Sequence, residues 1–449
     1  MGTLFGTDGV RGVANIPPMT AEMALEIGRA TAYVCKQAKH RHRILIGKDT
    51  RISCYMLENA LTAGICSMGV DVLLVGPIPT PGIAFLTQDM RADAGLVISA
   101  SHNPYQDNGI KIFSRSGYKL PDAAQDQIEE LVVSGQIKDI RPTADDIGRA
   151  SRIDDAAGRY VVFAKGTFPE KMTLDGVRIV LDCANGATYK IAPTVFAELG
   201  ADLIILHNAP NGMNINEACG SQYPADLSAA VKTHGADIGL AFDGDGDRLL
   251  VVDENGTILS GDHILAICAK FLKKQGRLQN NRVVTTVMSN FALHALLVQL
   301  GIEHLEAPVG DRYVLEMMNE HDSNLGGEES GHLIFLDHHT TGDGIICALQ
   351  LLAVLKTTGS PLSELASILT LAPQRLINVP VSKRPPIDEI PELRDAICSA
   401  EKKLEGRGRV LVRHSGTQSV CRVMVETADA GLTDRLAESL AETVKACIG

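Results

Sequence analysis

The chain has 449 residues, of which 45% are apolar, and a formal net charge of -12 at neutral pH. This length predicts several domains of about 100 to 150 residues each, and the acidic balance argues against a nucleic-acid-binding surface. Because no apolar stretch approaches the roughly 18 to 20 residues of a membrane span and the first residues lack the layout of a signal peptide, we expect a cytoplasmic protein that does not enter membranes.

One pattern recurs three times along the chain. Each copy opens with a basic residue and a β-branched run, at Arg43, Arg178 and Arg282. A stretch with helical periodicity follows, then a glycine, a small or branched residue and an acidic residue, and then a second strand-like run. The second runs fall at residues 72–76, 203–207 and 304–310. Strand, helix and strand within about 30 residues form a βαβ unit, which predicts three related α/β domains with parallel sheets covered by helices.

The pattern changes near residue 369. The segments 410–412 and 423–425 are typical of two strands around a small polar loop, and an amphipathic helix follows them. This order predicts a smaller C-terminal domain of the α+β class. Because no long linker interrupts the chain, we expect the domains to surround one central cleft. The predicted domains are residues 1–151, 152–250, 251–368 and 369–449.

The ten cysteines show no metal-binding or disulfide pattern. None forms a C-x-x-C pair, and several lie inside apolar runs, as Cys66, Cys268 and Cys347 do. Cysteine in such surroundings behaves as a small hydrophobic residue. We therefore expect buried thiols rather than disulfides or zinc ligands.

A serine lies in a loop of small residues directly after the strand-like run 94–98. The loop reads Ser99-Ala-Ser101-His102-Asn-Pro. We expect Ser101 to be well exposed there and able to carry a phosphoryl group. A plain serine-rich turn is the alternative. A serine hydrolase is disfavoured, because neighbouring Ser and His in sequence do not form a nucleophile and base pair and no G-x-S-x-G motif occurs. The chain also lacks a Walker A loop.

Three carboxylates alternate with glycines in the segment 243–248, between the apolar runs 238–242 and 249–253. Alternation lets Asp243, Asp245 and Asp247 converge on one hard cation, and the glycines permit the tight turn. Their spacing predicts a catalytic magnesium site.

Two other interpretations of this acidic segment remain. Asp243, Asp245, Asp247 and Glu254 match positions one, three, five and twelve of an EF-hand loop, but Arg248 replaces the required glycine and the flanks are typical of strands. A solvated acidic turn is the second alternative.

Two further polar loops lie in the C-terminal half. The segment 326–332 brings carboxylates, a hydroxyl and an imidazole together, which suits the binding of sugar hydroxyls. The segment 413–417 and Arg422 combine guanidinium groups, hydroxyls and a flexible backbone, which suits phosphate because guanidinium makes forked, charge-assisted contacts with phosphate oxygens. Either loop taken alone is also compatible with an ordinary capped polar turn.

The motifs together resemble those of the phosphohexomutase superfamily over essentially the whole chain. The opening motif in particular resembles that of its phosphoglucosamine mutase branch, whereas the phosphomannomutases and phosphoglucomutases open differently. The motifs that carry the resemblance are FGTDGVRG at 5–12, ISASHNP at 98–104, DGDGDR at 243–248, GGEESGH at 326–332 and R-x-SGT at 413–417. The four-domain architecture of that superfamily agrees with the repeat described above.

This resemblance implies an isomerase of amino sugar metabolism. The implied reaction interconverts glucosamine 6-phosphate and glucosamine 1-phosphate through a phosphoserine at Ser101 and a sugar 1,6-bisphosphate, and it supplies UDP-N-acetylglucosamine synthesis and cell wall precursors. The resemblance implies Mg²⁺ held by phosphorylated Ser101 with Asp243, Asp245 and Asp247, and a 1,6-bisphosphate as activator. A phosphoserine carries about -1.5 to -2 charges, so a divalent ion is needed beside three carboxylates.

The resemblance also assigns roles to further residues. Lys111 is the favoured residue for proton transfer, with Arg11 and His332 as assistants. The residues expected to hold the sugar and the phosphate that is not reacting are Arg248, Glu328, Ser330, Arg413, Ser415, Gly416, Thr417 and Arg422.

The last loop departs from the family pattern. Gln418 and Ser419 occupy the places where a Glu-Pro pair usually follows the S-G-T motif, and His414 is also unusual. The departure affects the expected loop rigidity and phosphate affinity, not the catalytic groups.

Two other functions are compatible with the sequence. One is a phosphomannomutase or phosphoglucomutase, because the sugar-binding loop does not reveal an amino group at carbon two, and the other is a non-catalytic sugar-phosphate sensor. The expected partner is a small sugar phosphate, and the sequence is compatible with a homodimer without specifying the oligomeric state.

Overall fold

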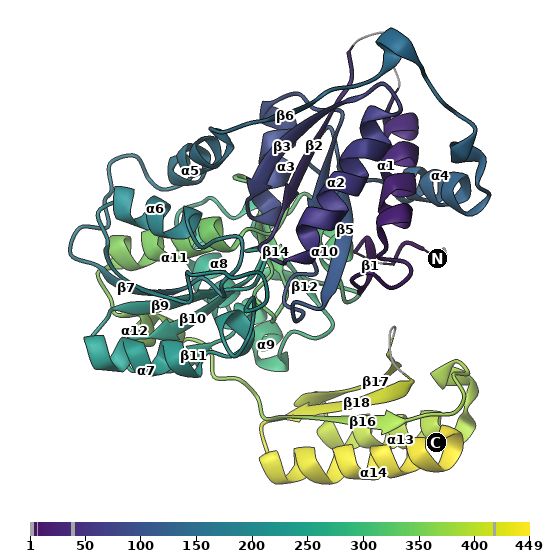
Figure 1. Ribbon diagram of the computed structural model, residues 1–449. Coiled ribbons are helices and arrows are strands. Elements are labelled where there is room, and N and C mark those ends of the chain that lie inside the picture. Colours follow the sequence, from purple (N-terminus) through teal and green to yellow (C-terminus); the bar gives the residue numbers. More distant parts are fainter. Residues whose placement is uncertain (1–3, 7, 37–40, 416–418) are drawn as a thin grey trace. The chain divides into compact units, whose positions relative to one another are not determined.

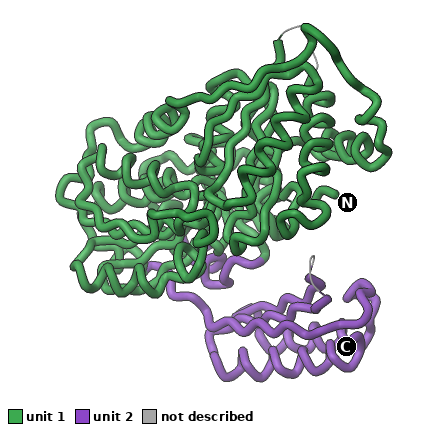
Figure 2. Tube along the Cα trace, in the orientation of Figure 1, with its two compact units in different colours: residues 1–287, 303–367 green, residues 288–302, 368–449 purple. Residues whose placement is uncertain are grey.

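The computed structural model divides into two compact units, shown in different colours in Figure 2. One unit comprises Met1–Val287 with Glu303–Ser367, and the other comprises Met288–Ile302 with Ile368–Gly449. The structure describes every residue except 1–3, 7, 37–40 and 416–418. Among the described residues, no helix combines the length and the apolar character that crossing a membrane requires.

The first sheet of the larger unit is mixed. Its strand order is β1 (Val10–Val13), β5 (Asp107–Ser114), β4 (Ala94–Ile98), β2 (Arg43–Lys48), β3 (Asp71–Pro77) and β6 (Ala150–Arg152). Its helices are α1 (Ala21–Cys35), α2 (Ser53–Cys66), α3 (Thr80–Asp89) and α4 (Asp122–Val133). β2 pairs in parallel with β3 and β4, whereas β5 is antiparallel to β4. The parallel β2–α2–β3 unit confirms the first predicted repeat.

The second sheet carries the acidic segment. Its strand order is β11 (Ile258–Leu259), β10 (Leu249–Asp253), β9 (Ile238–Phe242), β7 (Arg178–Asp182) and β8 (Asp202–Leu206). Its helices are α5 (Ala156–Gly166), α6 (Ile191–Glu198) and α7 (Ala225–His234). β7 pairs in parallel with β8 and β9, as the second repeat predicts. Because β10 and β11 extend this sheet past residue 250, we propose the second domain joint after β11.

The third sheet holds the loop expected to bind sugar hydroxyls. Its strand order is β13 (Glu303–Ala307), β12 (Arg282–Thr286), β14 (Leu325–Gly327) and β15 (Leu333–Phe335). Its helices are α8 (Gly261–Lys274), α10 (Asp311–Glu320), α11 (Gly344–Thr358) and α12 (Leu362–Ala366). β12 and β13 are parallel, which confirms the third repeat.

The smaller unit has a different architecture. Its antiparallel sheet has the order β16 (Gln374–Pro380), β18 (Val420–Thr427) and β17 (Gly408–His414). Its helices are α9 (Phe291–Gln299), α13 (Pro391–Leu404) and α14 (Ala430–Ile448). The predicted α+β class is confirmed, but α9, which the sequence assigns to the third repeat, belongs to this unit. In the part of the chain that the structure describes, short 3-10 turns span Gln136–Lys138, Ala144–Asp146, Gly220–Gln222, Gln279–Asn281 and Ile387–Glu389.

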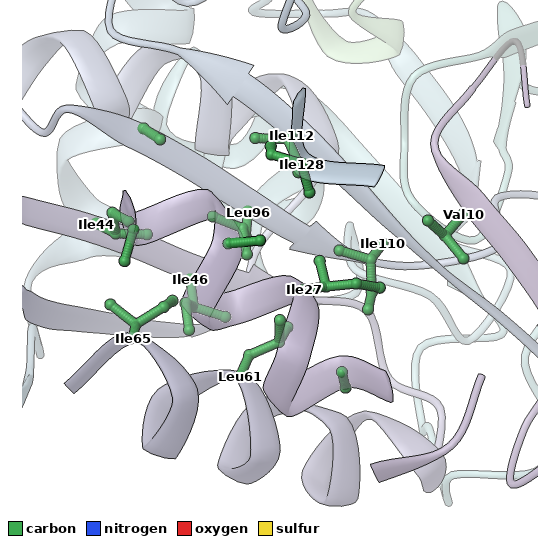
Figure 3. Close-up of a cluster of buried hydrophobic side chains, with 14 of the residues drawn as sticks. Val10, Ile27, Ile44, Ile46, Leu61, Ile65, Leu96, Ile110, Ile112 and Ile128 are labelled. Atoms are coloured by element: carbon green, nitrogen blue, oxygen red, sulfur yellow. The ribbon is translucent and has the colours of Figure 1, made fainter. Parts of the chain in front are cut away.

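The core of the first sheet packs against α1 and α2, which lie side by side in Figure 1. Apolar side chains of β2 and β4 meet those of the two helices, and Figure 3 shows Ile46, Leu61 and Ile65 in this layer. The helices approach closely at glycines. A Cβ atom on Gly28 would lie 2.7 Å from the Leu61 carbonyl oxygen, and one on Gly64 would overlap the backbone of α1. Burial of this layer holds in place the strands that end at the serine loop.

We predict that Gly28→Ala destabilises the larger unit by about 1 to 2 kcal/mol, because overpacking against rigid backbone outweighs the gain in helix propensity. Gly158→Ala in α5 is the matched control, since no heavy atom lies within 4 Å of its added Cβ. That control should stabilise the unit by up to about 1 kcal/mol. Thermal denaturation of both variants checks the prediction, and a Gly28→Ala midpoint at or above that of the wild type would contradict it.

Candidate active site

Ser101 follows β4 on a tight loop and faces the second sheet. Its side-chain hydroxyl donates a hydrogen bond to Asp243 Oδ2 at 2.6 Å. The expectation of a well-exposed serine is wrong, because the residue is only 2% exposed. The acidic segment and the 215–220 segment cover the loop: a Cβ on Gly244 would lie 2.6 Å from the Ser101 carbonyl oxygen. A group transferred to or from Ser101 therefore reacts in a site largely screened from water.

Buried hydrogen bonds fix the backbone of the serine loop. Ser101 has φ of +53°, a conformation that costs a non-glycine residue about 1 kcal/mol. The Arg51 guanidinium, which is fully buried and paired with Asp49, donates to the carbonyl oxygens of Ser101 at 3.1 Å and Asn103 at 2.5 Å. The Asn216 amide donates to the same two oxygens at 2.9 Å each. Residues from two sheets thus hold the serine in one strained position.

The three predicted carboxylates converge in the loop between β9 and β10. Ligand oxygens of Asp243, Asp245 and Asp247 lie within 4.8 Å of one another, and all three residues are buried. The flanking elements are strands, so the EF-hand interpretation is wrong. Burial and the charges of Asp247 and Asp245 raise the pKa of Asp243 well above its usual range. Ionising all three carboxylates together is therefore unfavourable without added positive charge.

The donor atoms of this cluster fit a divalent cation. Asp245 Oδ1 and Asp247 Oδ1 are buried and make no hydrogen bond with any described residue. Buried carboxylate oxygens normally have partners, so two that lack them within a cluster of three carboxylates indicate a ligand. Three carboxylates form a hard, all-oxygen donor set of the kind that Mg²⁺ and Ca²⁺ prefer.

Lys111 reaches this cluster from β5. Its Nζ lies 2.9 Å from Asp245 Oδ2, 3.6 Å from Asp247 Oδ2 and 3.3 Å from Asp8 Oδ2. Burial alone would lower the pKa of Lys111, but Asp245, Asp8 and Asp247 outweigh it and raise the pKa. Arg11 forms an ion pair with Asp8 from the same segment. Lys111 and Arg11, both expected from the sequence, therefore place two cations beside the serine and the carboxylates.

A second branch of ion pairs links Lys111 to His332. Lys119 Nζ lies 2.5 Å from both Asp8 Oδ1 and Asp311 Oδ2. His332 lies between Asp311 and Asp247, at 3.7 Å from each carboxylate. Burial opposes protonation of His332, but Asp247 and Asp311 raise its pKa to about 9. Together with Lys111, these residues close a ring of alternating charges. A cavity of about 190 Å³ borders the ring and is lined by Lys119, Asp311 and His332, among others.

The other expected sugar-binding residues lie on adjoining loops of the same unit. The Leu249 backbone N–H donates to the Gly331 carbonyl oxygen at 3.0 Å, which ties the loop of Glu328 and Ser330 to the acidic segment. Glu328 Oε1 accepts a hydrogen bond from the Gly310 N–H at 3.1 Å. Ser330 Oγ and Arg248 Nε are buried without a hydrogen bond to any described residue. These polar atoms can accept or donate bonds to a ligand.

The expected phosphate loop lies in the smaller unit. Arg413 and Arg422 face each other across β17 and β18, and the structure gives neither one a carboxylate partner among the described residues. Burial and the charge of Arg422 lower the pKa of Arg413. Ser415 is 2% exposed, and its N–H donates to the Val420 carbonyl oxygen at 2.9 Å. Two neighbouring cations without a counter-ion favour anion binding. Gly416, Thr417 and Gln418 lie outside the described residues.

Sequence reasoning missed several residues of the site. Asp8, Lys119 and Asp311 complete the ring of charges, and Arg51 and Asn216 hold the serine loop. Asp8 lies within the FGTDGVRG motif, which could have indicated it. The others come from segments without an unusual pattern, so only the fold brings them to the serine.

Comparison with known proteins identifies relatives over the full chain. The family models of the phosphoglucomutase/phosphomannomutase alpha/beta/alpha domains I, II and III and C-terminal domain match residues 2–137, 159–256, 260–371 and 376–443. Two curated proteins named phosphoglucosamine mutase, from Syntrophus aciditrophicus and Syntrophobacter fumaroxidans, are each 58% identical to the chain over the whole of both proteins.

Solved structures resemble the fold as well. A phosphoglucomutase/phosphomannomutase family protein from Burkholderia thailandensis has a TM-score of 0.81 and 26% identity, over 99% of this chain and 97% of that one. The Aspergillus fumigatus N-acetylphosphoglucosamine mutase, solved with GlcNAc-6P and magnesium, has a TM-score of 0.68 and 18% identity, over 99% of this chain and 95% of that one. At that identity the second likeness concerns the fold alone.

We predict that Asp245→Asn raises the dissociation constant for a divalent cation by at least about tenfold. Mutating a residue that only supports a metal ligand already lowers metal affinity by about tenfold to a hundredfold, and loss of a ligand should lower it at least as much. Asp237→Asn removes the same charge from an exposed position just before β9 and serves as the matched control. Isothermal titration of both variants checks this. Equal affinities in the two variants would exclude Asp245 as a ligand.

Proposed function

The chain belongs to the phosphoglucomutase/phosphomannomutase family and, within it, to the phosphoglucosamine mutases; from this premise we propose that it interconverts glucosamine 6-phosphate and glucosamine 1-phosphate. It is an isomerase. The observation that carries the proposal is the hydrogen bond from the buried Ser101 hydroxyl to a carboxylate of the converging acidic cluster. That arrangement suits a serine that alternately accepts and donates a phosphoryl group beside a cation.

We assign the metal site to Asp243, Asp245 and Asp247, with an oxygen of phosphorylated Ser101 completing the donor set. The unpartnered oxygens of Asp245 and Asp247 support this assignment, and Mg²⁺ is the ion we propose. Bound there, the ion supplies charge neutralisation and Lewis acidity to the phosphoryl group in transfer.

The reaction then runs in two halves. In the first half, the bond between phosphorus and Ser101 Oγ breaks, and phosphorus bonds to the free hydroxyl oxygen of the sugar phosphate. That sugar hydroxyl loses its proton, and Ser101 Oγ gains one. The bisphosphate then reverses its orientation, and its other phosphate returns to Ser101 by the same steps. We assign proton transfer to Lys111, with His332 and Arg11 as assistants. A bisphosphate that escapes leaves Ser101 unphosphorylated, so added sugar 1,6-bisphosphate serves as activator.

The sugar binds in two orientations, one for each half of the reaction. In both orientations, one set of residues must bind the ring hydroxyls and another must bind the phosphate that is not reacting. We assign the ring hydroxyls to Glu328, Ser330 and Arg248. The unpartnered buried atoms Ser330 Oγ and Arg248 Nε support a ligand contact there. We assign the phosphate that is not reacting to the segment 413–417 and Arg422. Two arginines at paired positions of β17 and β18 support anion binding there.

We expect the purified enzyme to turn over glucosamine 6-phosphate with a higher kcat/KM than glucose 6-phosphate or mannose 6-phosphate. The runner-up function, a phosphoglucomutase or phosphomannomutase of the same superfamily, predicts the opposite order. Parallel assays of the three sugar phosphates with Mg²⁺ and a matched 1,6-bisphosphate decide between them. Absence of turnover with all three would favour a sensor and refute the proposed activity.

We predict that Ser101→Ala abolishes both turnover and the covalently bound phosphate, because the hydroxyl is the acceptor in each cycle. Ser116→Ala is the matched control, since this exposed serine lies in the same domain outside the site. Intact mass, phosphopeptide mapping and a turnover assay give the readout. Activity that persists in Ser101→Ala would remove the phosphoserine from the mechanism.

We predict that Arg413→Lys lowers kcat/KM by about tenfold to a hundredfold in both directions, because a point charge replaces a forked contact worth roughly 1.5 to 3 kcal/mol. Phosphate on Ser101 should remain. Arg394→Lys changes an exposed arginine of α13 and should leave the kinetics unchanged. A defect confined to one direction would require two separate phosphate sites in place of one shared site.

A further inference from the structure

Three potential metal ligands converge in the second sheet, apart from the acidic cluster. Asp182 ends β7, His207 directly follows β8, and Cys219 directly precedes the 3-10 turn Gly220–Gln222. A carboxylate oxygen, an imidazole nitrogen and the thiol sulfur of these residues all lie within 4.8 Å of one another. Nothing in the phosphoryl transfer described above uses them.

The distance between the first two ligands is typical of a metal site. His207 Nδ1 lies 3.1 Å from Asp182 Oδ2, close enough for both atoms to contact one ion. Zinc bonds of about 2.0 to 2.1 Å in tetrahedral geometry separate a nitrogen ligand and an oxygen ligand by about 3.3 Å.

The surroundings restrain two of the three ligands, Asp182 and His207. Asp182 Oδ1 accepts a hydrogen bond from the Ala184 N–H and Asp182 Oδ2 one from the Gly220 N–H, both at 2.9 Å. The other ring nitrogen of His207 lies 3.7 Å from Asp226 Oδ2. Hydrogen-bonded carboxylate ligands, and histidines whose second nitrogen faces a carboxylate, are typical of protein metal sites. Asp182 and Cys219 are at most 1% exposed, so both side chains are shielded from solvent.

We propose that Asp182, His207 and Cys219 bind a borderline-soft divalent ion such as Zn²⁺, with water in the fourth position. One sulfur, one nitrogen and one oxygen suit that class of ion and not Mg²⁺. The ion ties together three segments of the second sheet. One of them carries Asn216, whose amide holds the Ser101 and Asn103 carbonyl oxygens. The role of the ion is therefore to support the serine loop structurally. This role is the same whichever sugar phosphate the enzyme uses.

Cobalt(II) is the probe for this site, because a cobalt–thiolate bond absorbs in the near ultraviolet whereas cobalt bound only by oxygen does not. The metal-free full-length protein is titrated with Co²⁺ in excess Mg²⁺, which occupies the acidic cluster. The thiolate band should saturate at one Co²⁺ per chain. Cys219→Ser should abolish it, and His207→Asn should weaken Co²⁺ binding at least about tenfold.

Two controls separate this site from other metal-binding groups. Cys398→Ser removes the exposed cysteine of α13 and should keep the band, as should Asp245→Asn in the acidic cluster. Thermal denaturation without metal verifies that each variant is folded, and His207→Asn, at a partly exposed position, remains informative if Cys219→Ser does not fold. Three results would each overturn the proposal. They are absence of the thiolate band in the wild type, persistence of the band in folded Cys219→Ser, and loss of the band in Asp245→Asn.

Discussion

Negative charge buried around one serine hydroxyl is the constraint on which the rest of the site depends. Asp243, Asp245 and Asp247 lie within a few ångströms of one another in an environment that excludes water. Burying a charge without a partner is costly, so the surrounding residues must supply positive charge. Lys111 does so directly, and its raised pKa reflects the strength of that demand. A phosphorylated Ser101 adds about -1.5 to -2 charges, which makes a divalent ion part of the electrostatic balance.

Rigidity around Ser101 follows from the same constraint, because a transferred group must meet fixed charges at fixed distances. The serine occupies a strained backbone conformation that local sequence does not favour. Hydrogen bonds from a charged donor contribute roughly 1.5 to 3 kcal/mol each, and Arg51 makes two such bonds to this loop. They offset a strain of about 1 kcal/mol. Because Arg51 comes from the first sheet and Asn216 from the second, the position of Ser101 depends on both domains.

Sequence periodicity predicted those parts of the fold that are determined locally. The strands before Ser101 and around the acidic segment form where alternating or continuous apolar runs occur, and the parallel repeats follow from their spacing. The carboxylates of the acidic segment were predicted for the same reason, since the segment is contiguous.

The burial of Ser101 and the ring of charges were not predictable in this way. Lys119 contacts Asp8 at a sequence separation of 111 residues and Asp311 at one of 192 residues. No period in a single sequence encodes contacts that depend on how separate sheets meet. Family resemblance supplied Lys111, Arg11 and His332, but not the residues that position them.

The topology of the second sheet explains why two cation sites of different chemistry adjoin one loop. β7, β8 and β9 are parallel, so Asp182, His207 and Asp243 all lie at the carboxyl ends of their strands, on one edge of the sheet. The segment 215–220 crosses this edge, with Asn216 bound to the serine loop and Gly220 bound to Asp182. The first site offers sulfur, nitrogen and oxygen ligands, whereas the acidic cluster offers only oxygen. The two sites therefore select different ions, and each can keep its own ion although they lie close together. An ion at the first site restrains the segment that restrains Ser101, and in this way structural metal binding supports the geometry of the phosphoryl-transfer site.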